Sequence, residues 1–558
     1  MTRWRWQEWN RKAFRRARKK GRPVLLFLTT SWCQACRAME SRVFSDEDVA
    51  QLISRSFVPV KVDSDRRPDI WRRFTMGAWP SVVFLTAGGD FITGTTYAAP
   101  DEFLSLLSAV SRHTRAGAEA FRAFPEAGTT PNPGPRVIRT DSVPLAPVPY
   151  FSALAAANLD SEHGGFGVAP KFPFPPAGRY LLARAFMGEA AALDALELTL
   201  NGMADGGLRG PYGGFHRLSA GADWSRPRPE RLLVDQAELA ALYLDAYSMT
   251  KNPLYREAAA GALDFMESRM GRTDGGFNTA VLDEPRAKRD GPAFSGPNAR
   301  AASAFIKADA VLGRPTAADL GRRIIDFLFD NFQGKRGLFR HSLEKTGATD
   351  PEFLSDQVDT LLLLADAYEA SGNNVFINEA QKLAWATVKF LFDLNSGAFL
   401  DSRPMNDAHF PNLVPYRPID ENARAAIALM RLGGLTGRRC FLETAESALA
   451  AFVHAFRAYG LSAADYGLAV MWLHEPKLEI FLSARNRREL RAGPLWRAAR
   501  TRYHPRKLIV IDGRRPLKSP PLKSPAPSSP AAVILFGDRE TTVATDSDEL
   551  IARISDAA

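Results

Sequence analysis

The strongest constraint on the fold is a repeat of about 60 residues that runs through the middle of the chain. A Gly-x-Phe motif recurs at intervals of 49, 62, 62 and 60 residues, ending at Phe166, Phe215, Phe277, Phe339 and Phe399. Each interval holds two segments whose apolar residues have helical spacing. Helix pairs that repeat with this period form either an open solenoid or a closed ring.

The two ends of the repeat favour the ring. Five complete helix pairs lie between residues 175 and 458, with one unpaired helix before them (147–158) and one after them (463–474). Docking the two unpaired helices together would supply a sixth pair and bury both of their exposed faces. We therefore predict an (α/α)6 six-hairpin barrel over residues 147–475, with the Gly-x-Phe loops gathered around a cavity at one end, where aromatic side chains suit sugar rings.

A pair of cysteines, Cys33 and Cys36, lies near the N-terminus in "TTSWCQACRAMESRVF" (29–44). A structural zinc site needs four Cys or His ligands, but the chain has only one further cysteine, Cys440, and the nearest histidine is His113. We therefore expect no metal. A thiolate at a helix start is stabilised by the positive end of the helix dipole, so the pair indicates redox chemistry, with Cys33 attacking and Cys36 resolving.

The elements around this pair follow the thioredoxin plan, which predicts a thioredoxin-like domain over residues 1–120. A buried strand precedes the pair, and a helix, the strand "FVPVKVDSD", a second helix, a hairpin with a Gly88-Gly89 turn and a last helix follow. In thioredoxin-like folds the bond before a proline at the position of Pro80 is cis and faces the thiols, so this resemblance adds Pro80 to the catalytic residues. The alternative is a thioredoxin fold whose cysteines stay reduced and inert.

The remaining segments complete a multidomain organisation. Residues 121–146 form a Pro-rich linker, and residues 476–558 contain three strand-like runs and a final helix, which predict a small α/β appendage. Within the appendage, "PLKSP" occurs twice in tandem, and we expect residues 514–530 to form a disordered loop rich in Pro, Ser and Lys.

The net charge of +10 arises largely from one segment. Ten Lys or Arg residues and a single acid, Glu8, lie between Arg3 and Arg22. The same segment spaces its apolar residues as a helix would, which predicts a helix with one packed face (Trp6, Trp9, Ala13, Phe14 and Ala17) and one solvated basic face. Because no recognition motif accompanies the charge, we do not expect nucleic acid as a partner.

The expected location is the cytoplasm. The chain contains only three cysteines, and its N-terminal segment lacks the apolar region of a secretory signal. No apolar run approaches the length of a membrane span.

Two loops carry a resemblance to a known family. "DSEHGGFGVAPKFPFP" (160–175) and "GPYGGFHRLSAGADWSRPRPERLLVDQAEL" (210–239), placed behind the CxxC domain, resemble the spermatogenesis-associated, thioredoxin-domain-containing family, also called YyaL-like. The likeness extends from about Trp6 to Trp472. It implies a thioredoxin-like domain followed by a barrel similar to N-acylglucosamine 2-epimerases, and a suspected role in carbohydrate metabolism. No cofactor is implied.

The same loops supply the candidate residues of a sugar cavity. They are Phe166, Phe215, His216, Trp224, Arg228, Glu230 and Asp235. The family has a histidine where this chain has Arg228, and a guanidinium stays charged at neutral pH and cannot shuttle a proton. Epimerisation needs an acid and a base on opposite faces of the carbon, so the resemblance implies a degenerate epimerase site at most. Arg228 is suited to clamp the carboxylate or phosphate of an acidic sugar.

Three classes of function therefore remain open. The first is a thiol-disulfide redox protein fused to a barrel that binds a sugar or an acidic sugar. The second is a redox protein that uses the barrel to select disulfide-containing clients and depends on a thioredoxin-reducing system. The third is a scaffold in which the aromatic residues are packed core and the acid before Gln236 anchors a neighbouring loop.

Overall fold

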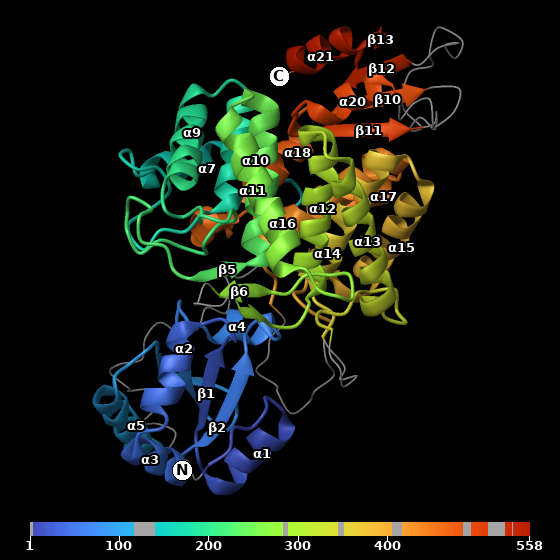
Figure 1. Cartoon of the computed structure of the whole chain (residues 1–558). Helices are drawn as coiled ribbons and strands as arrows, with labels where there is room; N and C mark the ends of the chain where they lie inside the picture. Colours follow the sequence, from blue (N-terminus) through green and yellow to red (C-terminus); the bar gives the residue numbers. More distant parts are fainter. Residues whose placement is uncertain are drawn as a thin grey trace. The chain divides into compact units, whose positions relative to one another are not determined.

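The computed structural model describes residues 4–115, 140–282, 288–343, 351–403, 416–483, 493–511, 531–537 and 539–557 (Figure 1). The chain divides into two compact units. Unit 1 contains Met1–Pro135 with Pro404–Tyr416, and unit 2 contains Arg136–Arg403 with Arg417–Ala558. The predicted linker lies largely outside the described residues, and the predicted disordered loop at 514–530 lies wholly outside them.

Unit 1 is built on a four-stranded sheet with the order β2-β1-β3-β4. Strands β1 (Val24–Thr29) and β2 (Val58–Asp63) are parallel, whereas β3 (Ser81–Leu85) is antiparallel to β1 and β4 (Phe91–Thr95) is antiparallel to β3. Every residue of β1 and β3 is buried, as the uninterrupted apolar runs predict. The helices are α1 (Arg11–Lys20), α2 (Gln34–Ala38), α3 (Glu47–Ser56), α4 (Pro68–Phe74) and α5 (Pro100–Arg115). The predicted thioredoxin-like fold is confirmed.

The basic N-terminal segment differs from its prediction. Helix α1 begins only after Asn10, whose side chain caps it by accepting the backbone N–H groups of residues 12 and 13 at 3.0 and 3.1 Å. Before the cap the chain is extended, because Gln7 exchanges two backbone hydrogen bonds with β2. The prediction that Trp6 and Trp9 lie on the helix is therefore wrong. The predicted buried face of the helix is present at Ala13, Phe14 and Ala17.

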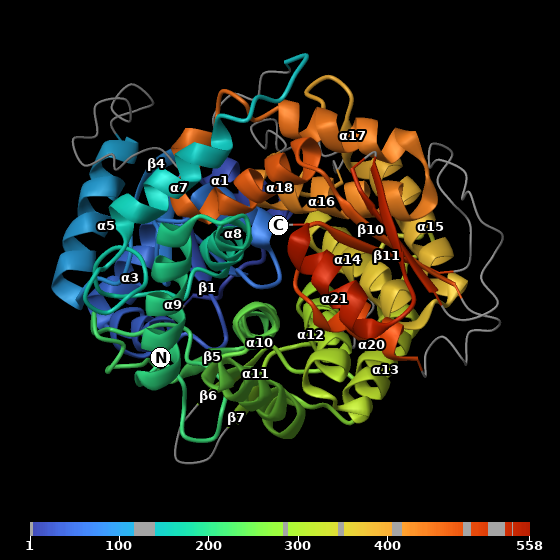
Figure 2. The same cartoon turned by 90° about the horizontal axis from the view of Figure 1, so that it is seen from above.

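Unit 2 contains a closed ring of six inner helices, which Figure 2 shows end on. They are α8 (Pro175–Phe186), α10 (Leu233–Thr250), α12 (Ser295–Leu312), α14 (Leu354–Ser371), α16 (Ile419–Thr436) and α18 (Ala464–His474). Each inner helix packs against the next, and α18 packs against α8 to close the ring.

The outer helices complete the six pairs. They are α7 (Pro147–Asn158), α9 (Ala190–Asp205), α11 (Pro253–Phe265), α13 (Pro315–Phe332), α15 (Asn374–Leu391) and α17 (Arg439–Ala450). Helix α7 packs against α18, so the first and last helices of the repeat form the sixth pair. The predicted (α/α)6 barrel is confirmed.

The Gly-x-Phe motifs are anchored by buried carboxamides. In four motifs, one Asn or Gln from the following inner helix bonds both the backbone N–H and the backbone C=O of the phenylalanine. The pairs, with the distances for N–H and C=O, are Gln236 with Phe215 (2.7 and 2.6 Å), Asn298 with Phe277 (2.8 and 3.3 Å), Gln357 with Phe339 (2.8 and 2.8 Å) and Asn422 with Phe399 (2.7 and 3.0 Å). The phenylalanine rings are buried in the core. The motif therefore fixes each loop to the helix that follows it.

We expect Gln357→Leu to lower the free energy of unfolding by about 1–3 kcal/mol, because it leaves the buried N–H and C=O groups of Phe339 unpaired. Urea unfolding of the full chain measures the loss. The control is Gln381→Leu, at a half-buried glutamine whose carbonyl accepts a hydrogen bond from Arg438. Equal losses in the two variants would mean that the clamp does not hold the loop.

The C-terminal part of unit 2 is a second four-stranded sheet, with the order β11-β10-β12-β13. The strands are β10 (Leu478–Ser483), β11 (Lys507–Ile511), β12 (Ala531–Phe536) and β13 (Arg539–Ala544), with helices α20 (Pro494–Thr501) and α21 (Ser547–Asp556). Strands β10 and β11 are parallel, and the other two pairings are antiparallel. This is the strand order and direction of the unit 1 sheet, in a segment without cysteine. The predicted α/β appendage is confirmed, and β13 is an additional strand.

Candidate functional site

The two cysteines of unit 1 lie at the start of a helix and form a disulfide. Cys33 is the N-cap of α2, and its Sγ accepts the backbone N–H of Cys36 at 3.1 Å. The two Cα atoms are 5.2 Å apart. The helix continues as a π-helical turn from Met39 to Val43, so the pair lies at the N-terminus of a longer helical segment. Unsatisfied N–H groups at this end favour negative charge on the Cys33 sulfur.

Three tryptophans pack on one another at the residue that precedes the disulfide. Cys33 is 4% exposed and Cys36 only 1%, so Cys33 is the more accessible of the two. The ring of Trp32 lies 5.4 Å from that of Trp79, which stacks in parallel on Trp71 at 3.9 Å. Since the Trp79-Pro80 bond is cis, the structure has the cis-proline that the resemblance implies, with Trp79 packed against the residue that precedes the CxxC pair.

Three of the predicted cavity residues are packed aromatics. Trp224 is 1% exposed, and its indole N–H donates to the backbone carbonyl of His163 at 3.0 Å. Phe215 is buried and stacks on Tyr243 at 5.3 Å, and Phe166 is buried in the same core. These rings support the loop end of the barrel from within.

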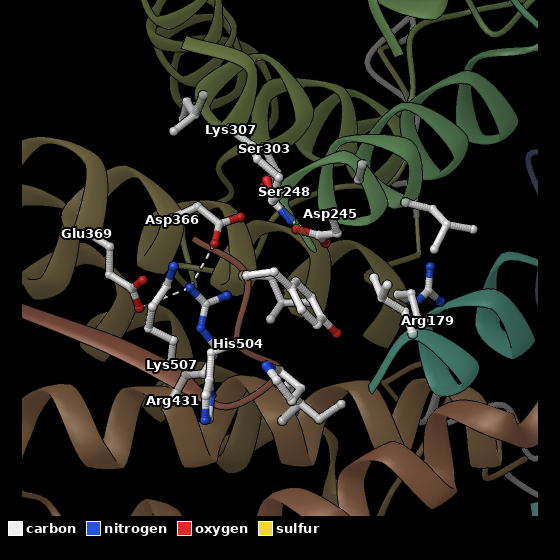
Figure 3. Close-up of a pocket in the computed structure, with 18 of the residues that line it drawn as sticks. Arg179, Asp245, Ser248, Ser303, Lys307, Asp366, Glu369, Arg431, His504 and Lys507 are labelled. Atoms are coloured by element: carbon white, nitrogen blue, oxygen red, sulfur yellow. Dashed lines mark hydrogen bonds and ion pairs between the residues drawn. The ribbon is translucent and has the colours of Figure 1, made fainter. Parts of the chain in front are cut away.

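The polar predicted residues divide into buried and exposed groups. His216 and Arg231 are both buried, and Nε2 of the imidazole lies 3.1 Å from Nη2 of the guanidinium. Glu230 is buried at the start of the short strand β5 (Glu230–Leu232). Arg228 is exposed. The seven predicted residues do not line the cavity shown in Figure 3.

Asp235, near the start of α10, has a perturbed acidity. Burial raises the pKa of its carboxyl to about 6, and the charges of Arg217 and Arg300 oppose this shift. Its Oδ2 is buried and accepts no hydrogen bond from the described residues. A carboxyl in this environment can exchange a proton near neutral pH.

The elevated pKa of Asp235 predicts a pH dependence of stability. The unfolded carboxyl ionises near 3.8 and the folded one near 6, so the folded state loses relative stability as pH rises between these values. We therefore expect the stabilising effect of Asp235→Asn to grow from pH 4 to pH 6 and then to level off. Unfolding free energies across this range test the effect, with the exposed Asp319→Asn as control. If the stability difference between Asp235→Asn and the wild type did not change with pH, the pKa of Asp235 would not be raised.

Sequence reasoning missed an acid–histidine pair at the loop end. Nδ1 of His341 lies 2.8 Å from Oδ2 of Asp356, and Oδ1 of the same carboxylate accepts the N–H of Gly296 at 3.0 Å. Asp356 immediately precedes the anchoring Gln357, as Asp235 precedes Gln236. The repeated Asp-Gln dipeptide was the signal that could have identified this pair.

Six charged residues form a ring inside the barrel. Each inner helix contributes one of them, and their signs alternate around the ring: Arg179, Glu238, Arg300, Asp359, Arg424 and Asp465. In α10, α12, α14 and α16 the charged residue is the sixth of the helix. Ion pairs join Arg179 to Asp465 at 2.7 Å and join Asp359 to Arg300 at 2.7 Å and to Arg424 at 2.6 Å, while Arg300 also pairs with Glu238.

A cavity of about 360 Å³ extends from this ring toward the C-terminal ends of the inner helices (Figure 3). One part of its wall is charged: Lys307 pairs with Asp245 at 2.7 Å, and Arg431 pairs with Asp366 and Glu369 at 2.8 and 3.1 Å. Another part is apolar and includes Leu182, Leu242, Leu468 and Trp472. Residues of the C-terminal segment, among them Tyr503, His504 and Lys507, complete the lining.

Two kinds of feature are absent from the described ranges. They contain no group of three or more His, Cys, Asp or Glu residues placed to hold a metal ion. In the same part of the chain, no helix combines the length and apolar character that a membrane crossing requires.

Known proteins are similar to the N-terminal domain and to about half of the whole chain. Residues 2–123 match the family model Thioredox_DsbH, described as a protein of unknown function, DUF255. Human spermatogenesis-associated protein 20 is 31% identical over 317 residues, which are 51% of this chain and 40% of the human protein. The thiol:disulfide interchange protein DsbD of Yersinia pestis is 28% identical over 80 residues, 14% of this chain and 13% of that protein.

Among solved structures, the sugar epimerase from a ruminal bacterium is similar over 59% of this chain and 96% of the epimerase chain, at 14% identity and a TM-score of 0.48. The chain spans about two fifths of the length of the curated human relative. Its predicted likeness to the family is confirmed. The chain is thus similar to the spermatogenesis-associated, thioredoxin-domain-containing proteins over half of its length, and its residues 2–123 match the Thioredox_DsbH model.

Proposed function

We propose that the N-terminal domain catalyses thiol–disulfide exchange. The observation that supports this most strongly is the position of Cys33, whose Sγ accepts the N–H of Cys36 at the start of α2. A hydrogen bond to sulfur and the positive end of a helix both stabilise a thiolate more than a thiol. Cys33 is therefore the nucleophile, and Cys36 is placed to form the second bond.

The exchange has two steps that move two electrons. In the reduced protein, the Cys33 thiolate attacks one sulfur of a substrate disulfide, which forms a mixed disulfide and releases the other substrate sulfur as a thiolate. The thiolate of Cys36 then attacks Sγ of Cys33 and displaces the second substrate thiolate. The substrate gains two electrons and two protons, and the protein is left with the Cys33–Cys36 disulfide. An external dithiol reductant restores the reduced protein.

The aromatic side chains beside the pair suit a protein client. Trp79 and its stacked neighbour Trp71 are only partly buried, and Trp79 packs on the buried Trp32, which directly precedes Cys33. Such side chains contribute contact area at a low cost in conformational entropy. We infer that the substrates are disulfide-containing polypeptides, reduced at the expense of a thioredoxin-reducing system.

The test is catalysis of disulfide reduction by the full chain. With dithiothreitol as reductant and a disulfide-linked peptide as substrate, we expect the wild type to accelerate reduction and Cys33→Ser to lose the acceleration. Cys440→Ser is the matched control, because this partly buried cysteine lies in the barrel and takes no part in the reaction. Catalysis that survives in Cys33→Ser, or that fails in the wild type, would refute the proposal.

The sugar-binding role that the resemblance implies for the loop end of the barrel remains a separate proposal. Support comes from the ion pair of His341 with Asp356 and from the raised pKa of the Asp235 carboxyl, both in residues close in sequence to Gly-x-Phe motifs. Phe166, Phe215 and Trp224 do not support it, because they are buried in the core. The exposed Arg228 remains available to an acidic sugar. Binding of glucose and glucuronate, measured on wild type and Arg228→Ala, tests that role.

A further inference from the structure

We propose that the cavity between the barrel and the C-terminal sheet binds a small organic anion, whose carboxylate or phosphate group pairs with Lys507. This site lies beyond the ring of six charges, near the C-terminal ends of the inner helices (Figure 3). It shares no residue with the dithiol site or with the predicted sugar cavity. The proposal is therefore independent of the proposed redox function.

Among the described residues of the lining, Lys507 and Arg502 form no ion pair with a carboxylate. Three of the cations at this end have carboxylates, since Lys307 pairs with Asp245, Arg431 pairs with two acids of α14, and Arg500 pairs with Asp309 at 2.8 Å. Lys507 forms no ion pair with any described residue, and its ammonium donates to one backbone carbonyl, that of Arg502. An ammonium has three donors, so two remain for a ligand.

The surroundings of Lys507 make an anionic ligand favourable. Burial lowers the pKa of its ammonium to about 8, and the opposing effects of Glu369 and Asp245 do not offset that burial. A positive charge removed from water is costly unless an anion accompanies it. A carboxylate or phosphate in the cavity would supply that anion at hydrogen-bonding distance.

The other walls define the rest of the ligand. Leu182, Leu242, Leu468 and Trp472 offer an apolar surface, which an inorganic ion alone would leave uncovered. In the same lining, Asp366 and Glu369 share one arginine and retain lone pairs that can accept hydrogen bonds from hydroxyl groups. The volume lies within the range of small-molecule sites. A hydroxylated organic acid or phosphate ester with one apolar face fits these walls.

The C-terminal sheet is an integral part of this site. Its residues Leu508, Val510, Val533 and Leu535 belong to the same hydrophobic core as the barrel helices. The backbone carbonyl of Ile511, at the end of β11, accepts a hydrogen bond from the hydroxyl of Tyr368 on α14 at 3.3 Å. Strand β11 therefore holds Lys507 against the barrel, and the ligand would contact both parts.

The test measures binding by isothermal titration to the full chain, with two matched pairs of probes. Glucuronate and glucose differ at the carboxylate, and glucose 6-phosphate and glucose differ at the phosphate. We expect at least one anion to bind and glucose to bind at least tenfold more weakly. We expect Lys507→Met to weaken anion binding at least tenfold and Lys507→Arg to retain it.

Two further variants test whether binding depends on this cavity and not only on the total charge of the protein. Lys382→Met removes the same charge from an exposed lysine on α15 and should leave binding unchanged. Ser303→Leu fills the cavity from α12 without changing its charge and should abolish binding. The proposal is overturned if neither anion binds the wild type, or if Lys507→Met binds an anion as tightly as Lys382→Met. Neither result bears on the redox activity of the N-terminal domain.

Discussion

A chain carrying Cys36→Ser is expected to become trapped as a mixed disulfide with its substrate. Cys33 can still attack, but the serine hydroxyl cannot resolve the intermediate, because it is neither ionised at neutral pH nor a partner for a sulfur–sulfur bond. With a disulfide-linked test peptide, intact-mass spectrometry should show nearly stoichiometric addition of one peptide thiol at Cys33.

The companion variants make this result specific. Cys33→Ser should add little peptide over the same period, because Cys36 is only 1% exposed and lies inside the helix start. We expect peptide addition to be slower than in Cys36→Ser by about 100-fold or more, because the Cys36 thiol is less ionised and less accessible than Cys33. Addition to Cys36 at a rate similar to that of Cys33 would reverse the assigned roles.

The second large effect is expected in the barrel, where Arg300→Met should lower the free energy of unfolding by as much as about 3–5 kcal/mol, because it takes one cation from Glu238 and leaves the buried Asp359 with Arg424 alone. Arg300 pairs with Glu238 and with Asp359, whose side chain is 2% exposed. Urea unfolding measures the loss. We expect the unfolding transition of the barrel to shift to a lower urea concentration, and that of the thioredoxin-like domain to stay unchanged.

The matched control is an ion pair on the surface. Arg439 and Glu443 pair at 3.0 Å on α17 with side chains that are 80% and 62% exposed. Arg439→Met should therefore cost no more than about 1 kcal/mol. If Arg300→Met costs as little as this control, the alternating ring does not hold the inner helices together.

The parts of the structure that were predictable depend on local or periodic signals. The CxxC pair was placed correctly because a buried strand, the two cysteines and a helix start lie within one short segment. The closed barrel was predictable because its helix pairs recur at nearly constant spacing. The extent of α1 was not, because Asn10 caps the helix and Gln7 pairs with β2, and these local interactions override the helical spacing of Trp6 and Trp9.

The parts that were missed depend on the closed ring itself. The six charges lie on six different helices and at unequal intervals, so only closure of the barrel brings them together. The Gly-x-Phe aromatics were assigned to a cavity because sugar sites favour such residues, whereas their recurrence has a structural cause in the carboxamides of Gln236, Asn298, Gln357 and Asn422. Strand β13 was missed because "RETTVA" is largely polar, as an edge strand can be.

The most direct test of the redox account is the pH dependence of thiol alkylation in the reduced full chain. Mass spectrometry can follow Cys33, Cys36 and Cys440 in one sample, with Cys440 as the internal reference. If Cys33 is the nucleophile, it should react fastest, and its rate should titrate with an apparent pKa below the value of about 8.5 for a free cysteine. Fastest reaction at Cys440, or titration of Cys33 as a free thiol, would contradict this role.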